Sequence, residues 1–221
     1  MAKEAAARRR TADELRHEIL HAAAEVFLER GYAGASIDQV IARVGGSKRA
    51  IYSHFGGKRE LFEAIVRRNS GRILGALGRE EVVRRDVAAT LLDFGMRALT
   101  ILMSPTPLAL YRLVVAEGAR FPELARAFFD AGPGRGAAGL AQALREFQRR
   151  GEIRVSDPRR AAEHFIGMLR DDLHLRVVLG LRPAPGPREI EQSVRQAVEI
   201  FLSGCRNPPS SRRRETKGAS P

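Results

Sequence analysis

Several features on which whole protein classes depend are missing from this sequence of 221 residues. Its single cysteine, Cys205, cannot form a disulfide within the chain, which favours a reducing compartment. No apolar run approaches the roughly 20 residues of a membrane-spanning helix, and the charged N-terminus lacks the apolar segment of a signal peptide. We therefore expect a soluble, cytoplasmic protein that makes no membrane contact.

Signatures of catalysis and cofactor binding are also missing. There is no Walker loop and no G-x-S-x-G, and the glycine-rich residues 134–139 follow no predicted strand. Asp171 and His174 share a helical face, but no second ligand lies at metal-binding spacing, so an ordinary helix-surface contact is the simpler interpretation. We predict no catalytic residue, no metal site and no cofactor. The rival class, a helical enzyme acting on an anionic substrate, needs an acid–base or metal site that the sequence does not contain.

Acidic residues are too few to balance the basic ones. The chain has 38 Lys and Arg against 26 Asp and Glu, a net charge of +12, which indicates a polyanionic partner. Residues 1–10 form a basic arm that is either a frayed end or a segment whose arginines reach a DNA groove. Residues 205–221 are expected to be a disordered basic tail. An alternative function is therefore a helical protein that binds nucleic acid through charge alone, without sequence preference.

The most informative stretch is residues 36–62, S-I-D-Q-V-I-A-R-V-G-G-S-K-R-A-I-Y-S-H-F-G-G-K-R-E-L-F. Ser36 and Gln39 have the spacing of a capping box at the start of a helix. Apolar residues at helical spacing follow, and a glycine pair ends the helix. Ser47 can then cap a second short helix, residues 48–53. Two short helices joined by a tight turn are the pattern of a helix-turn-helix.

Side chains in and after the second helix have the chemistry of DNA contacts. Lys48 and Arg49 lie in its first turn, where a recognition helix meets base edges, so we predict them as the base-contacting residues. Phosphates are bound well at helix N-termini and by donor side chains. The residues expected to hold phosphates and fix register are Ser36, Ser47, Tyr52, His54 and Lys58.

The same stretch resembles the DNA-binding signature of the TetR/AcrR family of transcriptional repressors. The residues that carry the resemblance are Ser36, 44–47 (V-G-G-S), 52–55 (Y-S-H-F) and 58–61 (K-R-E-L). Gly46 stands where the family usually has Val, and residues 48–50 replace a common run of small residues, so the base preference cannot be copied from a relative. The resemblance implies a repressor that binds double-stranded DNA and is released by a small molecule.

Apolar periodicity predicts an all-α fold of about nine helices, with no strand. A helix capped by Thr11 and stopped by Gly31 would complete a DNA-binding domain over residues 11–57. The helix from Lys58 continues to about Gly78 without a linker, so it would join this domain to a dimerisation and ligand-binding domain over residues 58–204. Later helices are expected over residues 86–103, 108–117, 121–131, 140–151, 157–177 and 189–202.

The middle of the chain resembles the C-terminal domain of the AefR-like branch of the same family, on residues 110–117, 120–124 and 161–165. This resemblance implies an inducer pocket between helices, although ordinary core packing is the simpler explanation for any one residue. The pocket would suit a hydrophobic or a cationic aromatic small molecule. Its candidate wall residues are Phe94, Leu99, Met103, Leu110, Tyr111, Phe128, Phe129, Phe165, Leu169 and His174.

The last two long helices each have a broad apolar stripe. The stripes face either the chain's own core or a second copy in a four-helix bundle, and the resemblance implies the second arrangement. A homodimer would place two reading helices about 34–36 Å apart on the successive major grooves of a palindromic operator. The residues expected in the interface are Phe165, Leu173, Val177, Ile190, Val194, Ala197, Val198 and Phe201.

Overall fold

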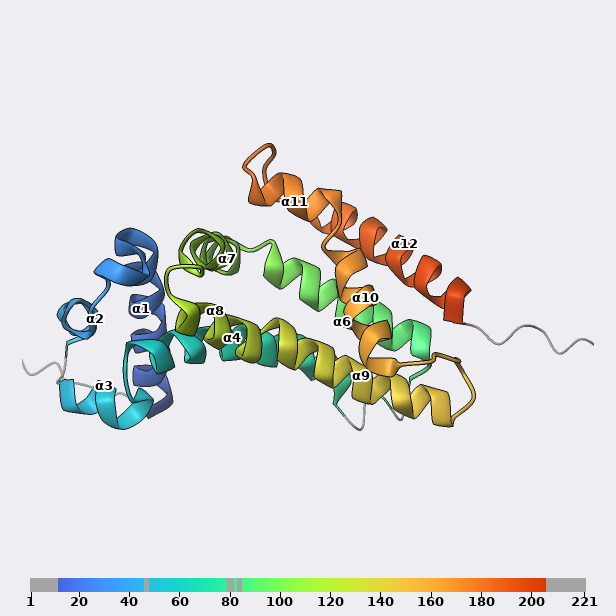
Figure 1. Cartoon of the computed structure of the whole chain (residues 1–221), viewed down its shortest axis with the longest axis horizontal. Helices are drawn as coiled ribbons and strands as arrows, with labels where there is room; N and C mark the ends of the chain where they lie inside the picture. Colours follow the sequence, from blue (N-terminus) through green and yellow to red (C-terminus); the bar gives the residue numbers. More distant parts are fainter. Residues whose placement is uncertain (1–11, 46–47, 79–81, 83–84, 206–221) are drawn as a thin grey trace, which may run out of the picture.

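The computed structural model describes residues 12–45, 48–78, 82 and 85–205, and within these ranges the chain forms helices and no strand. This confirms the all-α class, with more helices than the nine expected. The elements are α1 (Ala12–Gly34), α2 (Ile37–Val44), α3 (Lys48–Phe55), α4 (Lys58–Leu74), the 3-10 helix η1 (Gly75–Leu77), α6 (Val87–Leu102), α7 (Pro105–Glu117), α8 (Pro122–Ala131), α9 (Pro133–Arg149), α10 (Pro158–Leu169), α11 (Asp172–Val178) and α12 (Pro187–Cys205). Helices α1 to α3 form one end of the molecule, and α12 lies toward the other (Figure 1).

Local signals place α2 where the sequence predicts it. The Gln39 amide donates to Ser36 Oγ over 3.3 Å, and the Ser36 amide donates to Gln39 Oε1 over 2.9 Å, which completes the expected capping box. Gly45 ends the helix with a φ of 76°, a backbone conformation that favours glycine. The predicted cap Asp157 is present at the start of α10. Thr11 and Ser47, two further predicted caps, lie outside the described residues, as do the basic arm and the tail beyond Cys205.

Helix α4 joins two hydrophobic cores. Near its start, Phe62 is fully buried in a cluster that contains the apolar faces of α1, α2 and α3. Near its end, Ile73 packs against a second cluster, which is built from α6, α9, α10 and α12. The continuous helix expected from residue 58 is therefore present and links the end formed by α1, α2 and α3 to the other helices. The first cluster also includes Leu110 of α7 and Leu124 of α8, so the two cores do not separate at residue 58.

Two expected boundaries after residue 130 are wrong. Helix α9 begins at Pro133 rather than at residue 140, because proline is well tolerated in the first helical turn. The single helix expected over residues 157–177 is two helices, α10 and α11. Arg170 leaves the helical conformation, with φ −103° and ψ 47°. Asp171 then caps α11, and its carboxylate accepts from the amide of Leu173 over 3.0 Å. The role of the Asp171 carboxylate is therefore to cap α11, whereas the sequence suggested a side-chain contact with His174.

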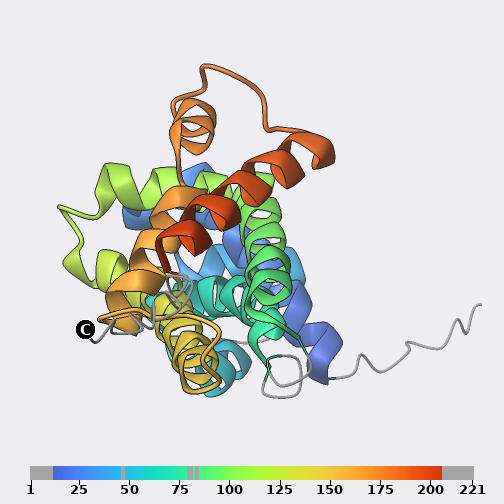
Figure 2. The same cartoon turned by 90° about the vertical axis from the view of Figure 1, so that its right-hand side faces the viewer.

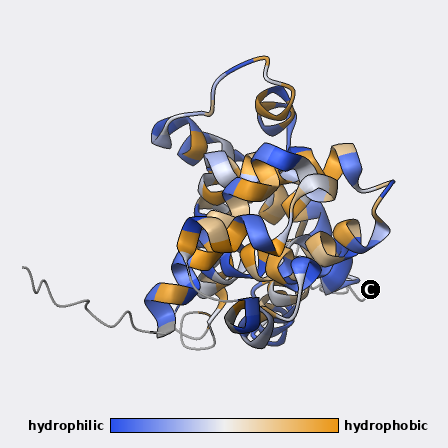
Figure 3. Cartoon of the chain, turned by 90° about the vertical axis from the view of Figure 1, so that its left-hand side faces the viewer, coloured by the Kyte–Doolittle hydropathy of each residue, from blue (hydrophilic) through white to orange (hydrophobic). Residues whose placement is uncertain are grey.

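Helix α12 packs closely on α6, because Gly95 leaves room for it. A Cβ at residue 95 would lie 2.6 Å from Val194 Cγ1, which is closer than atoms can approach. Helix α12 also lies across α10 (Figure 2). Figure 3 shows hydrophobic residues concentrated in the middle of the helical bundle.

Most of the residues expected in a dimer interface fill this intramolecular core. Phe165 and Val194 have no exposed surface. Leu173 is partly buried, and the rest are at most 8% exposed: Val177, Ile190, Ala197, Val198 and Phe201. These stripes therefore face the chain's own core, the alternative that the sequence left open, and they have little surface left for a second copy.

The described residues contain neither a single membrane-spanning helix nor a cluster of metal ligands. No single helix there is long and apolar enough to span a membrane; α6 and α7 together have the necessary length and composition, but they meet at an angle of 72°. No group of three or more His, Cys, Asp or Glu side chains in the same residues is arranged to hold a metal ion.

Candidate functional site

Helix α3 presents polar side chains on one side and is anchored on the other. Ile51 is 3% exposed and packs into the core of the three-helix unit. The guanidinium of Arg16, on α1, lies 4.9 Å from the centre of the Phe55 ring and holds the end of the helix. The side chains predicted to contact DNA on this helix are exposed: Lys48, Arg49, Tyr52 and His54.

The two cations in the first turn of α3 have different surroundings. Lys48 Nζ lies 2.8 Å from Asp38 Oδ1, and this hydrogen bond raises the pKa of the lysine. Both side chains are more than half exposed, so separating them costs little. Arg49 has no ion pair within the described part of the chain. Arg49 is therefore the cation that is free to meet a base edge without first losing a partner.

The side chain of Lys58 contacts the junction of α1 and α2, which its position in the sequence did not predict. Its ammonium donates to the carbonyl oxygens of Tyr32 at 2.8 Å and Ala35 at 3.2 Å, and lies 4.6 Å from the centre of the Tyr32 ring. The first turn of α4 holds the Glu60 carboxylate, whose pKa is lowered first by its own backbone N–H and then by Arg59. The Lys58 ammonium is thus engaged by two backbone carbonyls, and its expected phosphate contact stays a prediction.

A second contact ties the same segment to the body of the protein. The Glu117 carboxylate, at the end of α7, accepts from the amides of Tyr32 at 3.2 Å and Ala33 at 3.3 Å. The chain bends at Gly31, where φ is 67°, and a Cβ there would lie 2.6 Å from Glu117 Oε1. Glycine is thus required both by the backbone conformation and by the approach of the carboxylate. No local pattern predicts this contact, because its partners are 84 and 85 residues apart in the chain.

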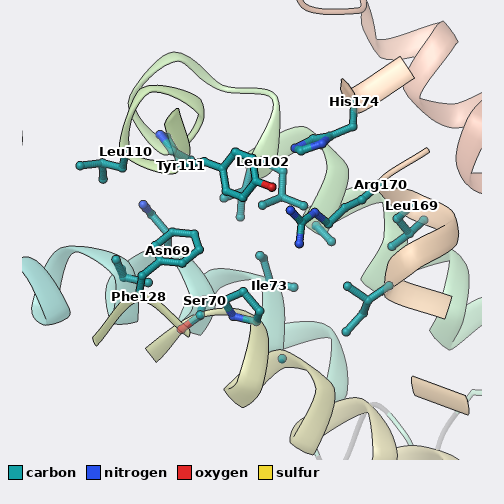
Figure 4. A pocket seen from close by; sticks show the side chains of 18 of the residues that line it. Asn69, Ser70, Ile73, Leu102, Leu110, Tyr111, Phe128, Leu169, Arg170 and His174 are labelled. Atoms are coloured by element: carbon teal, nitrogen blue, oxygen red, sulfur yellow. The ribbon is translucent and has the colours of Figure 1, made fainter. Parts of the chain in front are cut away.

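An internal cavity of about 100 Å³ lies between α4, α6, α7, α8, α9, α10 and α11 (Figure 4). Six of the predicted wall residues line it: Phe94, Leu110, Tyr111, Phe128, Leu169 and His174. Leu99, Met103 and Phe165 are buried elsewhere in the core, and Phe129 is 55% exposed in a groove outside the cavity. Sequence reasoning missed the wall residues contributed by α4, Asn69, Ser70 and Ile73, because it treated this helix only as the connection between the two domains. It missed Arg170 because charged residues are usually at the surface.

Polar groups gather on one side of this apolar cavity. The ring of Tyr111 contacts the ring of His174 with centres 5.6 Å apart. The guanidinium of Arg170 lies 4.8 Å from the centre of the Tyr111 ring. Burial lowers the pKa of His174, and the positive charge of Arg170 lowers it further. The imidazole is therefore neutral near pH 7, and the Arg170 guanidinium supplies the positive charge on this side of the cavity.

The fold and these two sites define a class of protein. A helix-turn-helix presents an exposed α3, and two long helices connect it to a helical domain with an internal cavity. Residues 19–65 match the family model for bacterial regulatory proteins of the tetR family. Residues 89–204 match the model for the C-terminal domain of AefR-like transcriptional repressors. The chain belongs to the tetR family and is a transcriptional regulator, not an enzyme.

Known proteins with similar sequences are also regulators. The transcriptional activator FasR of Mycolicibacterium smegmatis is 40% identical over 65 residues, which cover 29% of this chain and 30% of FasR. The regulator UidR of Escherichia coli is 30% identical over 151 residues, which cover 64% of this chain and 70% of UidR. The match to FasR thus spans less than a third of the length of that protein. The match to UidR is longer and extends beyond the DNA-binding end.

Solved structures extend the similarity over nearly the whole chain. A putative TetR-family regulator from Mesorhizobium loti has a TM-score of 0.69 at 27% identity, and the match covers 90% of this chain and all of that one. The flavonoid-responsive regulator FrrA has a TM-score of 0.65 at 29% identity, with the same coverage. Both the DNA-binding end and the cavity-bearing domain therefore belong to one shared architecture.

Proposed function

We propose that this tetR-family protein is a ligand-responsive repressor that binds a palindromic operator as a homodimer and is released by a small-molecule inducer. One observation carries the proposal. Helices α4 and α7 both line the internal cavity and both reach the three-helix unit that carries the exposed α3, because α4 packs on α3 and α7 packs on α1. A change in the cavity can therefore reach the DNA-binding end through two rigid elements.

Helix α3 is proposed to lie in the major groove. Arg49 and Lys48 contact base edges from its first turn, while Ser36, Tyr52 and His54 contact the backbone and fix the register. The predicted phosphate contact of Ser47 stays a prediction, because that residue lies outside the described ranges. Lys58 acts indirectly by holding the link between α1 and α2. An eight-residue helix reads only a few base pairs, so two copies are needed for a specific operator.

The ligand response is proposed to act on residues 32–35. Helix α7 lines the cavity with Leu110 and Tyr111, and its last residue, Glu117, accepts from two amides in this segment. Helix α4 lines the cavity with Asn69, and its first residue, Lys58, donates to two carbonyls in the same segment. Both helices therefore hold the segment directly before α2, one through its amides and the other through its carbonyls.

An inducer shifts this arrangement only by binding one conformation more tightly than the other. At about 100 Å³, the cavity is smaller than most ligand pockets, so a larger inducer has to move its walls apart. Displacement of α4 or α7 would reorient the two reading helices of a dimer. The description of FrrA as flavonoid-responsive supports a ligand response, and the AcnR repressors of Corynebacterium support repression.

The homodimer is proposed to form through apolar side chains that the core leaves exposed. Leu175 of α11 is 52% exposed, Leu179 and Leu181 directly after this helix are 62% and 69% exposed, and Ile200 of α12 is 61% exposed. Helices α11 and α12 lie away from α3 (Figure 1). Pairing through these helices would leave both copies of α3 free to meet one DNA duplex.

The experiment is a mobility shift with footprinting on the DNA upstream of the protein's own gene, against random competitor and at two salt concentrations. The proposal predicts a protected palindrome that survives the competitor. If random DNA abolishes binding, the competing explanation is attraction through charge alone. Deleting residues 1–10 and 206–221 tests that explanation directly, because it predicts that binding is lost with the basic ends.

A further inference from the structure

The polar side of the cavity is built from four separate elements. Asn69 comes from α4, Tyr111 from α7, Arg170 from the end of α10 and His174 from α11. Figure 4 shows these side chains pointing toward the same space, above apolar side chains such as Ile73. Polar groups that converge from distant parts of the chain onto an apolar cavity are the usual form of a ligand site.

Arg170 is half-buried and lacks an acidic partner. Within the described residues, no carboxylate lies at ion-pair distance from its guanidinium, which instead rests on the face of Tyr111. Two nearby arginines are paired: Arg159 with Glu163 and Arg176 with Asp172. A partly desolvated guanidinium with unused donors favours an anionic partner.

The walls of the cavity carry no compensating negative charge. Among the described residues that line it, there is no Asp or Glu. His174 is 5% exposed, and its buried imidazole is neutral near pH 7 for the reasons given above. A cationic ligand would therefore lose its hydration and gain no counter-charge, while an anionic one would meet Arg170. This argues against the cationic inducer that the sequence left open.

A surface groove leads to the same residues. It is lined in part by Tyr111, Arg170 and His174, which also line the cavity. Phe129 and Leu175 flank the groove and are 55% and 52% exposed. Two acidic residues lie in it, but both are engaged. Glu163 pairs with Arg159, and the Asp171 carboxylate caps α11.

The volume limits the ligand. An apolar cavity of about 150 Å³ is known to hold benzene, so a cavity of about 100 Å³ accepts at most one ring before its walls move. From the size, the apolar lining and the unpaired guanidinium, we infer that the cavity binds a small aromatic compound carrying an ionised oxygen, a carboxylate or a phenolate. The ring lies among the apolar walls, and the oxygen accepts from Arg170. The inference rests on the proposed function, because it gives a chemical class to the inducer.

The test is calorimetric titration of the full chain with three matched probes: benzoate, its neutral amide benzamide, and benzylammonium. Benzoate is expected to bind about ten- to a hundredfold more tightly than benzamide, since a hydrogen bond to a charged group exceeds a neutral one by that amount. Benzylammonium is expected not to bind. Titration with 4-nitrophenolate tests whether a phenolate binds in place of a carboxylate. Titration with 1-naphthoate tests whether the cavity accepts two fused rings or only one.

Arg170→Met keeps the aliphatic stem and is expected to reduce benzoate affinity to that of benzamide. Arg176→Met is the matched control, because Arg176 is exposed, paired with Asp172 and not part of the cavity wall. Its benzoate affinity should equal that of the natural chain. Circular dichroism of both variants confirms that the fold is retained.

Three results would overturn the inference: equal affinity for benzoate and benzamide, unchanged benzoate affinity in Arg170→Met, or no binding of any acid in the panel. None of these three results would contradict operator binding by the unliganded protein. Conversely, an acid that binds through Arg170 but leaves the operator complex intact would support the inference and contradict the inducer role in the proposed function.

Discussion

At the scale of single residues, Arg49 is the side chain on which DNA specificity is proposed to depend. It is exposed on α3 and has no ion pair in the described residues, whereas Lys48 is paired with Asp38. Arg49→Ala is expected to cost about 1–3 kcal/mol on the operator and to relax base preference at one position. Competition mobility shifts with single-base operator variants measure both quantities. Arg188→Ala, an exposed change on α12, is the control. An equal loss on every sequence would show that Arg49 contacts only the backbone.

Lys58 provides a test that separates positioning from phosphate binding. Lys58→Met removes two hydrogen bonds to carbonyls and the contact of the ammonium with the face of the Tyr32 ring. The free energy of unfolding should therefore fall by about 1–3 kcal/mol. The slope of log affinity for DNA against log salt should stay the same. Denaturant unfolding and salt titrations of DNA binding are the two measurements. A slope reduced by about one with unchanged stability would restore the phosphate contact.

His174 makes stability depend on pH. Burial lowers its folded pKa below the ordinary 6.5, so the unfolded chain takes up the proton at a higher pH than the folded chain does. The stability associated with a neutral His174 is present above pH 6.5 and is lost as the pH falls through the range below it. Unfolding by urea at pH 7.5 and 5.5 should therefore show a smaller loss of stability in His174→Gln than in the natural chain. An equal loss of stability in both proteins would mean that groups other than His174 control the stability at acid pH.

At the scale of elements, the bend at the end of α1 is expected to be sensitive to a single methyl group. Gly31→Ala places a side chain at positive φ and against the Glu117 carboxylate, so it should destabilise the protein by about 1–3 kcal/mol and weaken DNA binding. Gly34→Ala is the matched control, because the new methyl group would meet only Arg30 Cβ at an ordinary 3.5 Å. Thermal unfolding and DNA affinity of the two variants check this. Similar behaviour of both would show that Glu117 does not hold the bend.

Elements with local signals were predicted well, and those set by distant contacts were not. The capping box of α2 and the Asp157 cap of α10 depend on residues within one turn, so they can be read from sequence. The break at Arg170 has no such local signal, and the early start of α9 was missed although Pro133 suits the first turn of a helix. The cavity shows the same division. Tyr111 and His174 were predicted as apolar-site residues, but Arg170 was not, because no local pattern shows that a charged side chain faces inward.

At the scale of the whole molecule, the proposed dimer would depend on the exposed leucines in and directly after α11. Leu179→Glu puts a charge at a side chain that is 62% exposed, and it should convert a dimer to a monomer in sedimentation equilibrium. Val115→Glu on α7 is the matched control, because Val115 is similarly exposed at 65% but lies on another element. The dimer should persist in this control. A persistent dimer in Leu179→Glu would place the interface elsewhere.

The most direct test of sequence-specific reading by α3 is selection from a random DNA library by the purified full chain. The account predicts one enriched motif made of two inverted half-sites, with centres separated by about one or two turns of DNA, and a position in each half-site that becomes degenerate when Arg49→Ala is used instead. Recovery of sequences with no common motif, by a protein that still binds DNA, would contradict the account. The net charge of +12 would then be the whole reason for DNA binding.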